Sequence, residues 1–376
     1  MGLWRIVLFV SIGLTAIGIG SLYNKLTSVP PLPKLESTWW GPGQPHNVDK
    51  SIRPFRINIS QEVLDDLNIR LQHVKLTPPL EGIGFQYGFN TDYLKKVVDF
   101  WRTKYNWRER EAYLNSFPQF KTQVDGLDLH FLHVKPKNVP PSTRVLPLLL
   151  LHGWPGSVRE FYEIIPLLTT PREGVNFVFE VVVPSLPGYG FSEGASKPGL
   201  GSAQMAVVFK DLMARLGFDK FYVQGGDWGV ALTDSPVGLA AYILEKFSLG
   251  TNANFRSKSD GGLTHKFRLA DLLDNVMIYW VTGSITTSVR LYSEGFSKAQ
   301  RELGILSIPT KVPTACVWFP HEIRYVPEYF LREKYHNLLQ NSHMKQGGHF
   351  AALEEPKLLA EDIFSAIKLM LDQKST

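Results

Sequence analysis

A glycine-flanked aspartate marks the most distinctive pattern of this chain, GGDWG at residues 225–229. The residues before it, 221–224, are typical of a short buried strand, so Asp227 is predicted to lie on the sharp turn at the end of that strand. Glycine permits such a turn because it has no Cβ to clash with the backbone. A carboxylate exposed on a strained turn is a candidate nucleophile.

A late histidine is the predicted partner of this carboxylate. His349 follows two glycines and comes after the last predicted strand. An α/β-type hydrolase has its nucleophile, acid and histidine in that order along the chain, so His349 is the candidate general base. The alternatives lack this combination of a glycine-rich loop and a late position: His152, His336 and His343.

Backbone donors for a developing oxyanion are expected on two turns. An apolar strand ends at Leu151 and is followed by the loop HGWPG at residues 152–156. In an α/β-hydrolase such a loop supplies one N–H, and the residue after the nucleophile supplies the second. The corresponding residues are Trp154 and Trp228. An ordinary strand-to-helix turn uses the same glycines and prolines, so this motif alone leaves both interpretations open.

A literal G-x-S-x-G pattern at residues 190–194 offers Ser192 as a rival nucleophile. A nucleophilic serine of this kind needs a strand directly before it and a helix directly after it. Ser192 instead follows a proline- and glycine-rich turn and precedes Pro198 and Gly199, which disfavours a serine mechanism.

From residue 127 onward, predicted strands alternate with predicted helices, which is typical of an α/β fold with a mainly parallel sheet covered on both faces. The predicted strands span residues 127–134, 145–151, 177–183, 221–224, 314–319 and 334–340, and the predicted helices span 157–168, 202–216 and 356–371.

The N-terminal third differs in character. Residues 6–23 carry no charge and are about long enough to cross a membrane as a helix, so residues 1–25 are predicted to form a single-pass membrane anchor, with a signal peptide or a buried helix as alternatives. Residues 26–126 are expected to be a lead-in to the catalytic domain. This segment begins with a proline- and tryptophan-rich tether and continues with helices over 61–73 and 91–101.

Composition excludes several classes of partner. The net charge is +5, but basic and acidic residues are interspersed, so no nucleic-acid partner is expected. A single cysteine, Cys316, excludes intramolecular disulfides. His130 and His133 lie three apart on a predicted strand and point to opposite faces, so no shared metal ion is expected.

Four motifs together resemble the microsomal epoxide hydrolases, and most of all their insect juvenile hormone branch. The motifs are HGWPGS at residues 152–157, PGYGFS at 187–192, GGDWG at 225–229 and GGHF at 347–350. The N-terminal apolar segment, the WWGPG stretch at 39–43 and the helical lead-in match as well. The likeness therefore covers nearly the whole chain.

This resemblance implies an α/β-hydrolase with a helical cap, held on the endoplasmic reticulum membrane, that adds water to lipophilic epoxides without a cofactor. It implies that Asp227 is the nucleophile, His349 the base, Glu322 the acid that orients His349, and Tyr292 one of two phenolic proton donors. His321 and Asp234 are weaker alternatives to Glu322, because neither has its place in the chain order. Without the resemblance, Tyr292 would be interpreted as a packing residue.

The chain departs from that family directly after Gly229. Pro236 follows within two helical turns, and no strand is predicted before residue 308. Several dozen residues are therefore expected to be missing, namely the helix after the nucleophile, a core strand and the first part of the cap, which leaves a shortened cap over residues 234–306. This loss is expected to impair activity. An inactive, membrane-anchored lipid-binding homologue and a haloalkane dehalogenase remain as alternatives.

Overall fold

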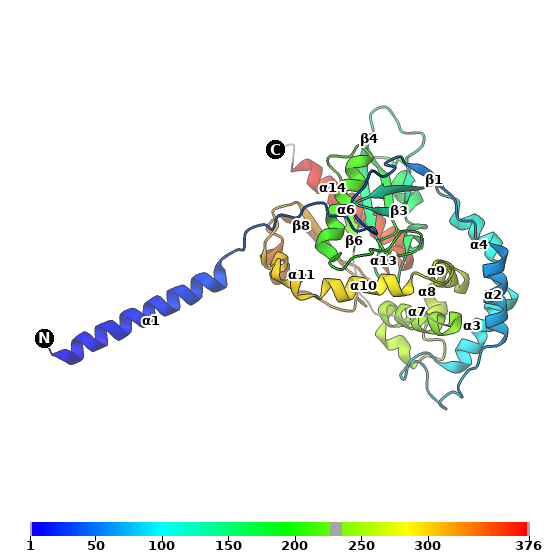
Figure 1. The fold of residues 1–376 in the computed structure, drawn as a ribbon, viewed down its shortest axis with the longest axis horizontal. Helices are drawn as coiled ribbons and strands as arrows, with labels where there is room; N and C mark the ends of the chain where they lie inside the picture. Colours follow the sequence, from blue (N-terminus) through cyan, green and yellow to red (C-terminus); the bar gives the residue numbers. More distant parts are fainter. Residues whose placement is uncertain (1, 226–234, 374–376) are drawn as a thin grey trace.

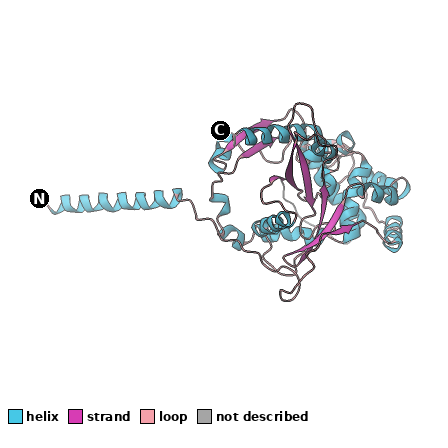
Figure 2. Cartoon of the chain, turned by 90° about the horizontal axis from the view of Figure 1, so that it is seen from above, coloured by secondary structure: helices cyan, strands magenta, loops and turns pink. Residues whose placement is uncertain are grey.

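The computed structural model describes residues 2–225 and 235–373. Its first helix, α1 (Leu3–Thr27), extends away from the rest of the chain in both views (Figures 1 and 2). Large apolar side chains along this helix are exposed. Within these described ranges, no helix has both the length and the apolar character that crossing a membrane requires.

The lead-in contributes three helices on one side of the molecule (Figure 1): α2 (Gln61–Gln72), α3 (Thr91–Thr103) and α4 (Trp107–Leu114). The leucines that repeat at helical spacing in α2 are buried, as its amphipathic pattern predicts. Asparagine side chains cap α3 and α4 by accepting backbone N–H bonds. The sequence analysis predicted α2 and α3 but not α4.

Two strands within the lead-in were not predicted. These are β1 (Arg53–Phe55) and β2 (Gln119–Val124), and β2 forms an antiparallel hairpin with β3 (Leu127–Val134). The hairpin turns at Asp125 and Gly126, both of which have positive φ angles, as a two-residue hairpin turn requires. Trp40 of the tether donates its backbone N–H to Asp125 O at 2.8 Å, so the tether packs against this turn.

The main sheet has the strand order β1-β2-β3-β5-β4-β6. Its central strands, β4 (Arg144–Leu151) and β5 (Phe177–Pro184), are apolar and largely buried, and they are parallel to each other. Strand β6 (Tyr222–Gly225) is also parallel to β4. The parallel arrangement predicted for these three strands is confirmed, while β1, β2 and β3 add an antiparallel half.

The helices next to the sheet are α5 (Ile165–Thr169), α6 (Ser202–Arg215) and α14 (Pro356–Asp372). Phe364 of α14 stacks on Phe177 of β5, with ring centroids 5.5 Å apart. The single helix predicted over 157–168 is wrong: a 3₁₀ turn, η1 (Val158–Phe161), precedes α5 there. Pro166 lies in the first turn of α5, where its missing N–H does no harm.

A second, separate sheet consists of β7 (Thr314–Trp318) and β8 (Leu338–His343), which are parallel. The strand predicted over 334–340 is therefore misplaced. Residues up to Lys334 belong instead to helix α12 (Glu328–Lys334), in which Arg332 pairs with Glu328 one turn away.

The two sheets are separated where the sequence analysis expected a missing core strand. From 235 to 313 the described chain is helical or irregular apart from an isolated bridge at Thr310. Strand β6 therefore ends the main sheet, and Val223 in β6 is 56% exposed. An apolar residue of an inner parallel strand is normally covered on both faces. This exposure is consistent with the loss of the segment that would cover it.

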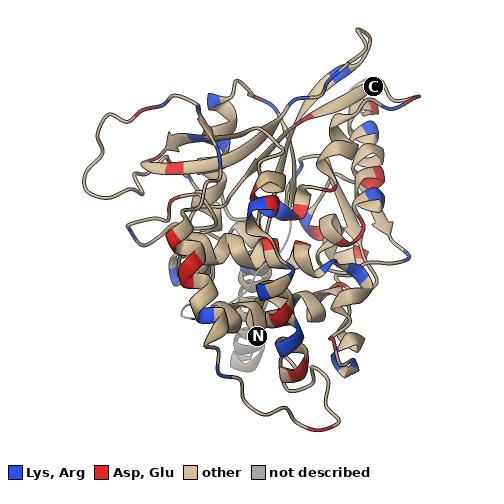
Figure 3. Ribbon diagram, turned by 90° about the vertical axis from the view of Figure 1, so that its right-hand side faces the viewer, with Lys and Arg blue, Asp and Glu red and all other residues tan. Residues whose placement is uncertain are grey.

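Helices fill the region expected to be the cap. They are α7 (Pro236–Thr251), η2 (Ala253–Ser257), α8 (Leu263–Lys266), α9 (Leu269–Thr282), α10 (Ile285–Gly295), α11 (Lys298–Glu302) and η3 (Ile305–Ser307). The last short helix of the chain before α14 is α13 (Ala351–Glu354). Basic and acidic residues are intermingled along the ribbon in the view of Figure 3.

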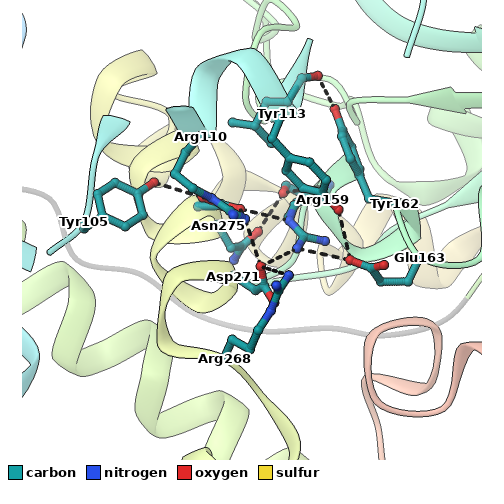
Figure 4. Close-up of polar contacts among 12 residues, drawn as sticks. Tyr105, Arg110, Tyr113, Arg159, Tyr162, Glu163, Arg268, Asp271 and Asn275 are labelled. Carbon is teal, nitrogen blue, oxygen red and sulfur yellow. Dashed lines mark hydrogen bonds and ion pairs between the residues drawn. The ribbon is translucent and has the colours of Figure 1, made fainter. Parts of the chain in front are cut away.

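A charged cluster joins the lead-in, the segment after β4 and the cap (Figure 4). Asp274 of α9 is fully buried and accepts from Arg110 Nε of α4 at 2.7 Å and from Arg159 Nε of η1 at 3.1 Å. Asp271 accepts from the same two arginines and from Arg268. Burying charges is tolerated only when they are paired, so these contacts hold the three segments together.

Removal of the Asp274 carboxylate should destabilise the fold, because the arginines of the cluster would lose a counter-charge. We expect Asp274→Ala to lower the free energy of unfolding by about 3–5 kcal/mol, because the buried Arg159 and the half-buried Arg110 lose a counter-charge. The measurement is denaturant unfolding followed by circular dichroism. Asp92→Ala is the control, since its ion pair with Lys95 is exposed and should contribute less than about 1 kcal/mol. Equal losses in the two variants would contradict the structural role of the cluster.

Candidate active site

The carboxyl ends of strands β4, β6 and β7 open into one cavity of about 490 Å³. The register pairs Leu151 of β4 with Gly225 of β6, so the chain leaves both strands at the same edge of the sheet. Leu151, Gln224 and Trp318 line the cavity from β4, β6 and β7. Ligand sites of open α/β sheets lie at this edge.

His349 and Glu322 also line this cavity and contact each other. His349 Nδ1 lies 2.6 Å from Glu322 Oε1. His349 is on the loop after β8 and Glu322 is on the loop after β7, and 27 residues separate them in the chain. A carboxylate in this position fixes the imidazole tautomer, with the proton on Nδ1, and leaves Nε2 to exchange a proton.

The loop that carries His349 passes very close to the end of α7. His349 donates its backbone N–H to Gly250 O at 2.9 Å. A Cβ atom on Gly348 would lie 2.4 Å from Thr251 O and 2.6 Å from Gly250 O. A glycine is therefore required at position 348 because the two backbones lie so close together, and not because of its φ angle.

The carboxylate of Glu322 is kept ionised by its neighbours. Partial burial would by itself raise the pKa of Glu322, but the hydrogen bond and the charge of His349, together with the N–H of Ile323, lower it below the usual value of 4.5. Glu322 is consequently a carboxylate at neutral pH and can stabilise a histidine cation.

Side chains bind three carbonyl groups of the loop that follows β4. Gly153 O lies 2.9 Å from His152 Nδ1, Pro155 O accepts from Asn275 Nδ2 at 2.5 Å, and Gly156 O accepts from Tyr279 Oη at 2.6 Å. Asn275 and Tyr279 belong to the cap helix α9. The cap thus supports the predicted oxyanion loop.

Tyr292 packs against this loop but does not line the cavity. Its ring centroid lies 6.4 Å from that of Trp154, in an edge-on arrangement, and the residue is buried on α10. Tyr242 of α7 contacts the same indole at 5.6 Å. Trp154 also donates its indole N–H to Ser288 Oγ at 3.2 Å.

The remaining predicted residues fall into two groups. Asp227 and Trp228 lie outside the described residues. The rivals occupy structural roles: Ser192 Oγ accepts from His130 N and donates to Ser185 O, and His336 donates its backbone N–H to Thr310 O. Glu322 has His349 as its imidazole partner, whereas His152 binds the backbone of Gly153 and Leu186.

Sequence reasoning did not single out Asn275 or Tyr279. Both residues lie within an apolar helical run, where a polar side chain at a core position could have served as the signal. Their partners, the carbonyls of Pro155 and Gly156, are more than a hundred residues away in the chain.

Comparison with known proteins gives a consistent result. The family described as "Epoxide hydrolase N terminus" matches residues 52–161, and the one described as "alpha/beta hydrolase fold" matches residues 147–232. The chain is 49% identical to juvenile hormone epoxide hydrolase 2 of Ctenocephalides felis over 96% of this chain and 95% of that protein. It is 43% identical to epoxide hydrolase 1 of Oryctolagus cuniculus over 89% of this chain and 93% of that protein.

Solved structures agree with the sequence comparison. The crystal structure of juvenile hormone epoxide hydrolase from the silkworm Bombyx mori matches with a TM-score of 0.86 and 39% identity, covering 90% of this chain and 99% of that one. The structure of Aspergillus niger epoxide hydrolase matches with a TM-score of 0.69 and 27% identity, covering 85% and 97%.

The comparison also bears on the expected missing segment. The match to the Ctenocephalides felis relative runs over 441 positions, more than the 376 residues of this chain. That relative therefore has several dozen residues without a counterpart here, as the sequence analysis predicted. The match to the α/β-hydrolase description ends at residue 232, close to the predicted junction.

Gly348 provides a direct test of the histidine loop. We expect Gly348→Ala to lower the free energy of unfolding by about 1–3 kcal/mol, because the new methyl group would collide with two backbone carbonyls. The measurement is the denaturation midpoint, compared with that of Gly13→Ala, whose new Cβ would have nothing within 4 Å. A Gly348→Ala protein as stable as the parent would show that the two backbones separate freely.

Proposed function

This chain belongs to the epoxide hydrolase family, and from that premise we propose that it opens lipophilic epoxides to diols through an ester on Asp227. The contact between His349 and Glu322 beside the cavity carries the proposal, because it is the acid–base pair that release of such an ester needs. Asp227 is the second residue after β6, whose carboxyl end lies at the edge of this cavity.

The first chemical step forms the ester. A carboxylate oxygen of Asp227 attacks one epoxide carbon, and the bond from that carbon to the epoxide oxygen breaks. The oxygen leaves as an alkoxide and takes a proton from a phenol, which later regains a proton from solvent. We propose Tyr292 as this donor, which requires the bound epoxide to extend from the cavity to the buried ring beside Trp154. A phenol suits this role because it donates from an apolar environment, and Tyr292 is buried beside Trp154.

The second step hydrolyses the ester. His349 removes a proton from water as the water oxygen attacks the ester carbonyl, and Glu322 stabilises the resulting imidazolium. The N–H groups of Trp154 and Trp228 stabilise the oxyanion of the tetrahedral intermediate. The intermediate collapses and the leaving diol oxygen takes the proton from His349. The carboxylic acid of Asp227 then loses the second proton of the water to solvent, which restores the carboxylate.

We propose lipophilic epoxides as the substrate class and expect slow turnover. Two relatives are named for juvenile hormone, and that compound is therefore the first substrate to test. The helix expected after Asp227 in full-length relatives would hold the strained turn and direct its N-terminal dipole toward the developing negative charge. Its absence should reduce the rate.

Attachment to the endoplasmic reticulum membrane through α1 completes the proposal. Leu14, Ile17 and Ile19 are each at least 64% exposed, and α1 extends away from the catalytic part (Figure 1). Burial of such side chains in lipid removes apolar surface from water. A membrane also concentrates lipophilic substrates close to the cavity.

Trapping the ester tests the chemistry. In His349→Ala we expect incubation with juvenile hormone to leave a covalent adduct on the peptide containing Asp227, because ester breakdown slows by about 10²–10⁴-fold. Mass spectrometry of the digested protein detects the adduct. His336→Ala is the control and should release diol at the parent rate.

Three outcomes would contradict this proposal. Epoxide hydrolysis would be excluded if His349→Ala formed no adduct and the parent released no diol. Saturable binding of the epoxide without diol release would favour an inactive lipid-binding protein. Release of halide from a short haloalkane by the parent, without epoxide turnover, would favour dehalogenation.

Fractionation tests the membrane attachment. We expect replacement of Leu14 and Ile17 by Asn to move the protein from the microsomal pellet to the supernatant, because polar amides are costly to place in lipid. Leu306→Asn, at a leucine outside α1 that is even more exposed, should leave the protein in the pellet. Extraction with alkaline carbonate then separates an inserted helix from a surface contact. A double variant that stays in the pellet would exclude α1 as the anchor.

A further inference from the structure

His152 is held by two backbone groups that determine its tautomer. Leu186 donates its N–H to His152 Nε2 at 3.2 Å, so Nε2 is the acceptor nitrogen. The proton must therefore be on Nδ1, which donates to Gly153 O at 2.9 Å. The ring is buried and packs edge-on against Tyr189. Burial lowers the pKa of His152 to about 4, so the ring is neutral at pH 7.

The hydrogen bond from His152 Nδ1 to Gly153 O also fixes the direction of the Trp154 N–H. A peptide unit is planar, and its N–H points opposite to its C=O. The carbonyl of Gly153 and the N–H of Trp154 belong to the same peptide unit, so holding one orients the other. Among the described residues, no protein group accepts a hydrogen bond from Trp154 N, and Gly153 lines the cavity. An oxyanion donor needs this combination of a fixed direction and an unoccupied N–H.

We propose that His152 is a positioning residue, which aims the N–H of Trp154 at the oxyanion of the ester-hydrolysis step by holding the carbonyl of Gly153. This inference rests on the proposed function. The imidazole neither gains nor loses a proton in the reaction. Its two nitrogens link the loop after β4 to the backbone after β5, so the direction of the donor is set by the sheet itself.

This role makes a step-specific prediction. Attack of a carboxylate on an epoxide carbon creates no oxyanion at the carboxyl group, whereas attack of water on the ester does. Loss of the aimed N–H should therefore slow ester breakdown and leave ester formation nearly unchanged. A general loosening of the fold would slow both steps.

Substitutions of His152 can separate the contributions of its two ring nitrogens. Asn places an amide N–H near the position of Nδ1 and keeps the donor to Gly153 O, whereas Leu removes both partners. His130→Leu is the matched control: His130 is also fully buried, and its nitrogens contact Ser185 Oγ and Gln119 Oε1 instead of the loop. Its loss should destabilise the fold without misdirecting Trp154.

Single-turnover kinetics with juvenile hormone, followed by mass spectrometry of the intact protein, measures both steps. We expect His152→Leu to slow ester breakdown on the order of a hundredfold and to change ester formation by less than about threefold. His152→Asn should be within about tenfold of the parent in both steps. The proposal is overturned if His152→Leu breaks the ester down at the parent rate, or if His130→Leu shows the same selective loss.

A structural measurement keeps the inference separate from the proposed chemistry. If the parent forms no ester, the proposed function fails, and crystal structures of the two His152 variants then decide the positioning role. We expect the peptide between Gly153 and Trp154 to be rotated in His152→Leu and to keep its orientation in His152→Asn. An unrotated peptide in His152→Leu would overturn the inference.

Discussion

The cost of burying charge is the constraint on which much of this structure depends. Asp274 is removed from water, and it is tolerated because Arg110 and Arg159 reach it from two different segments. If either arginine moved away, the buried carboxylate would lose a counter-charge. This cost fixes one arrangement of the lead-in, the loop after β4 and helix α9. The neighbours of Asp274 on the same helix, Asn275 and Tyr279, are thereby placed to bind carbonyl groups of the loop. A structural ion cluster thus helps to set the geometry of the loop that is the candidate oxyanion site.

The interrupted sheet explains how a shortened chain can retain the pieces of an active site. Strands β4 and β6 end at one side of the break and β7 ends at the other, and the cavity lies where these ends meet. Glu322 and His349 come from loops of the second sheet, so their mutual contact does not require the missing strand. The exposure of Val223 is the structural consequence of that loss. Helix α14 packs against β7 and β8 on one side and, through Phe364, against Phe177 of β5 on the other.

Two histidines of this site have opposite properties for a clear physical reason. Burial keeps His152 neutral, and the backbone groups bonded to both nitrogens leave no nitrogen for chemistry. His349 has one nitrogen bonded to a carboxylate and lines the cavity. Desolvation favours the neutral imidazole, which is what a residue that only holds a peptide needs. A carboxylate partner stabilises the imidazolium, which is what a residue that accepts a proton needs. The same side chain therefore serves as a fixed support in one loop and as the candidate base in another.

The sequence alone determined the local elements and the order of the chemical groups. Continuous apolar runs such as Phe177–Pro184 have few alternatives to a buried strand, and glycine-flanked motifs identify sharp turns from neighbouring residues only. The start of β8 and the existence of β2 were missed, because a charged helix end and a half-polar strand depend on what they pack against. Only the tertiary structure decided that Glu322 contacts His349 and that Asn275 holds Pro155. Such contacts join residues distant in the chain, and their geometry depends on how whole sheets and helices pack.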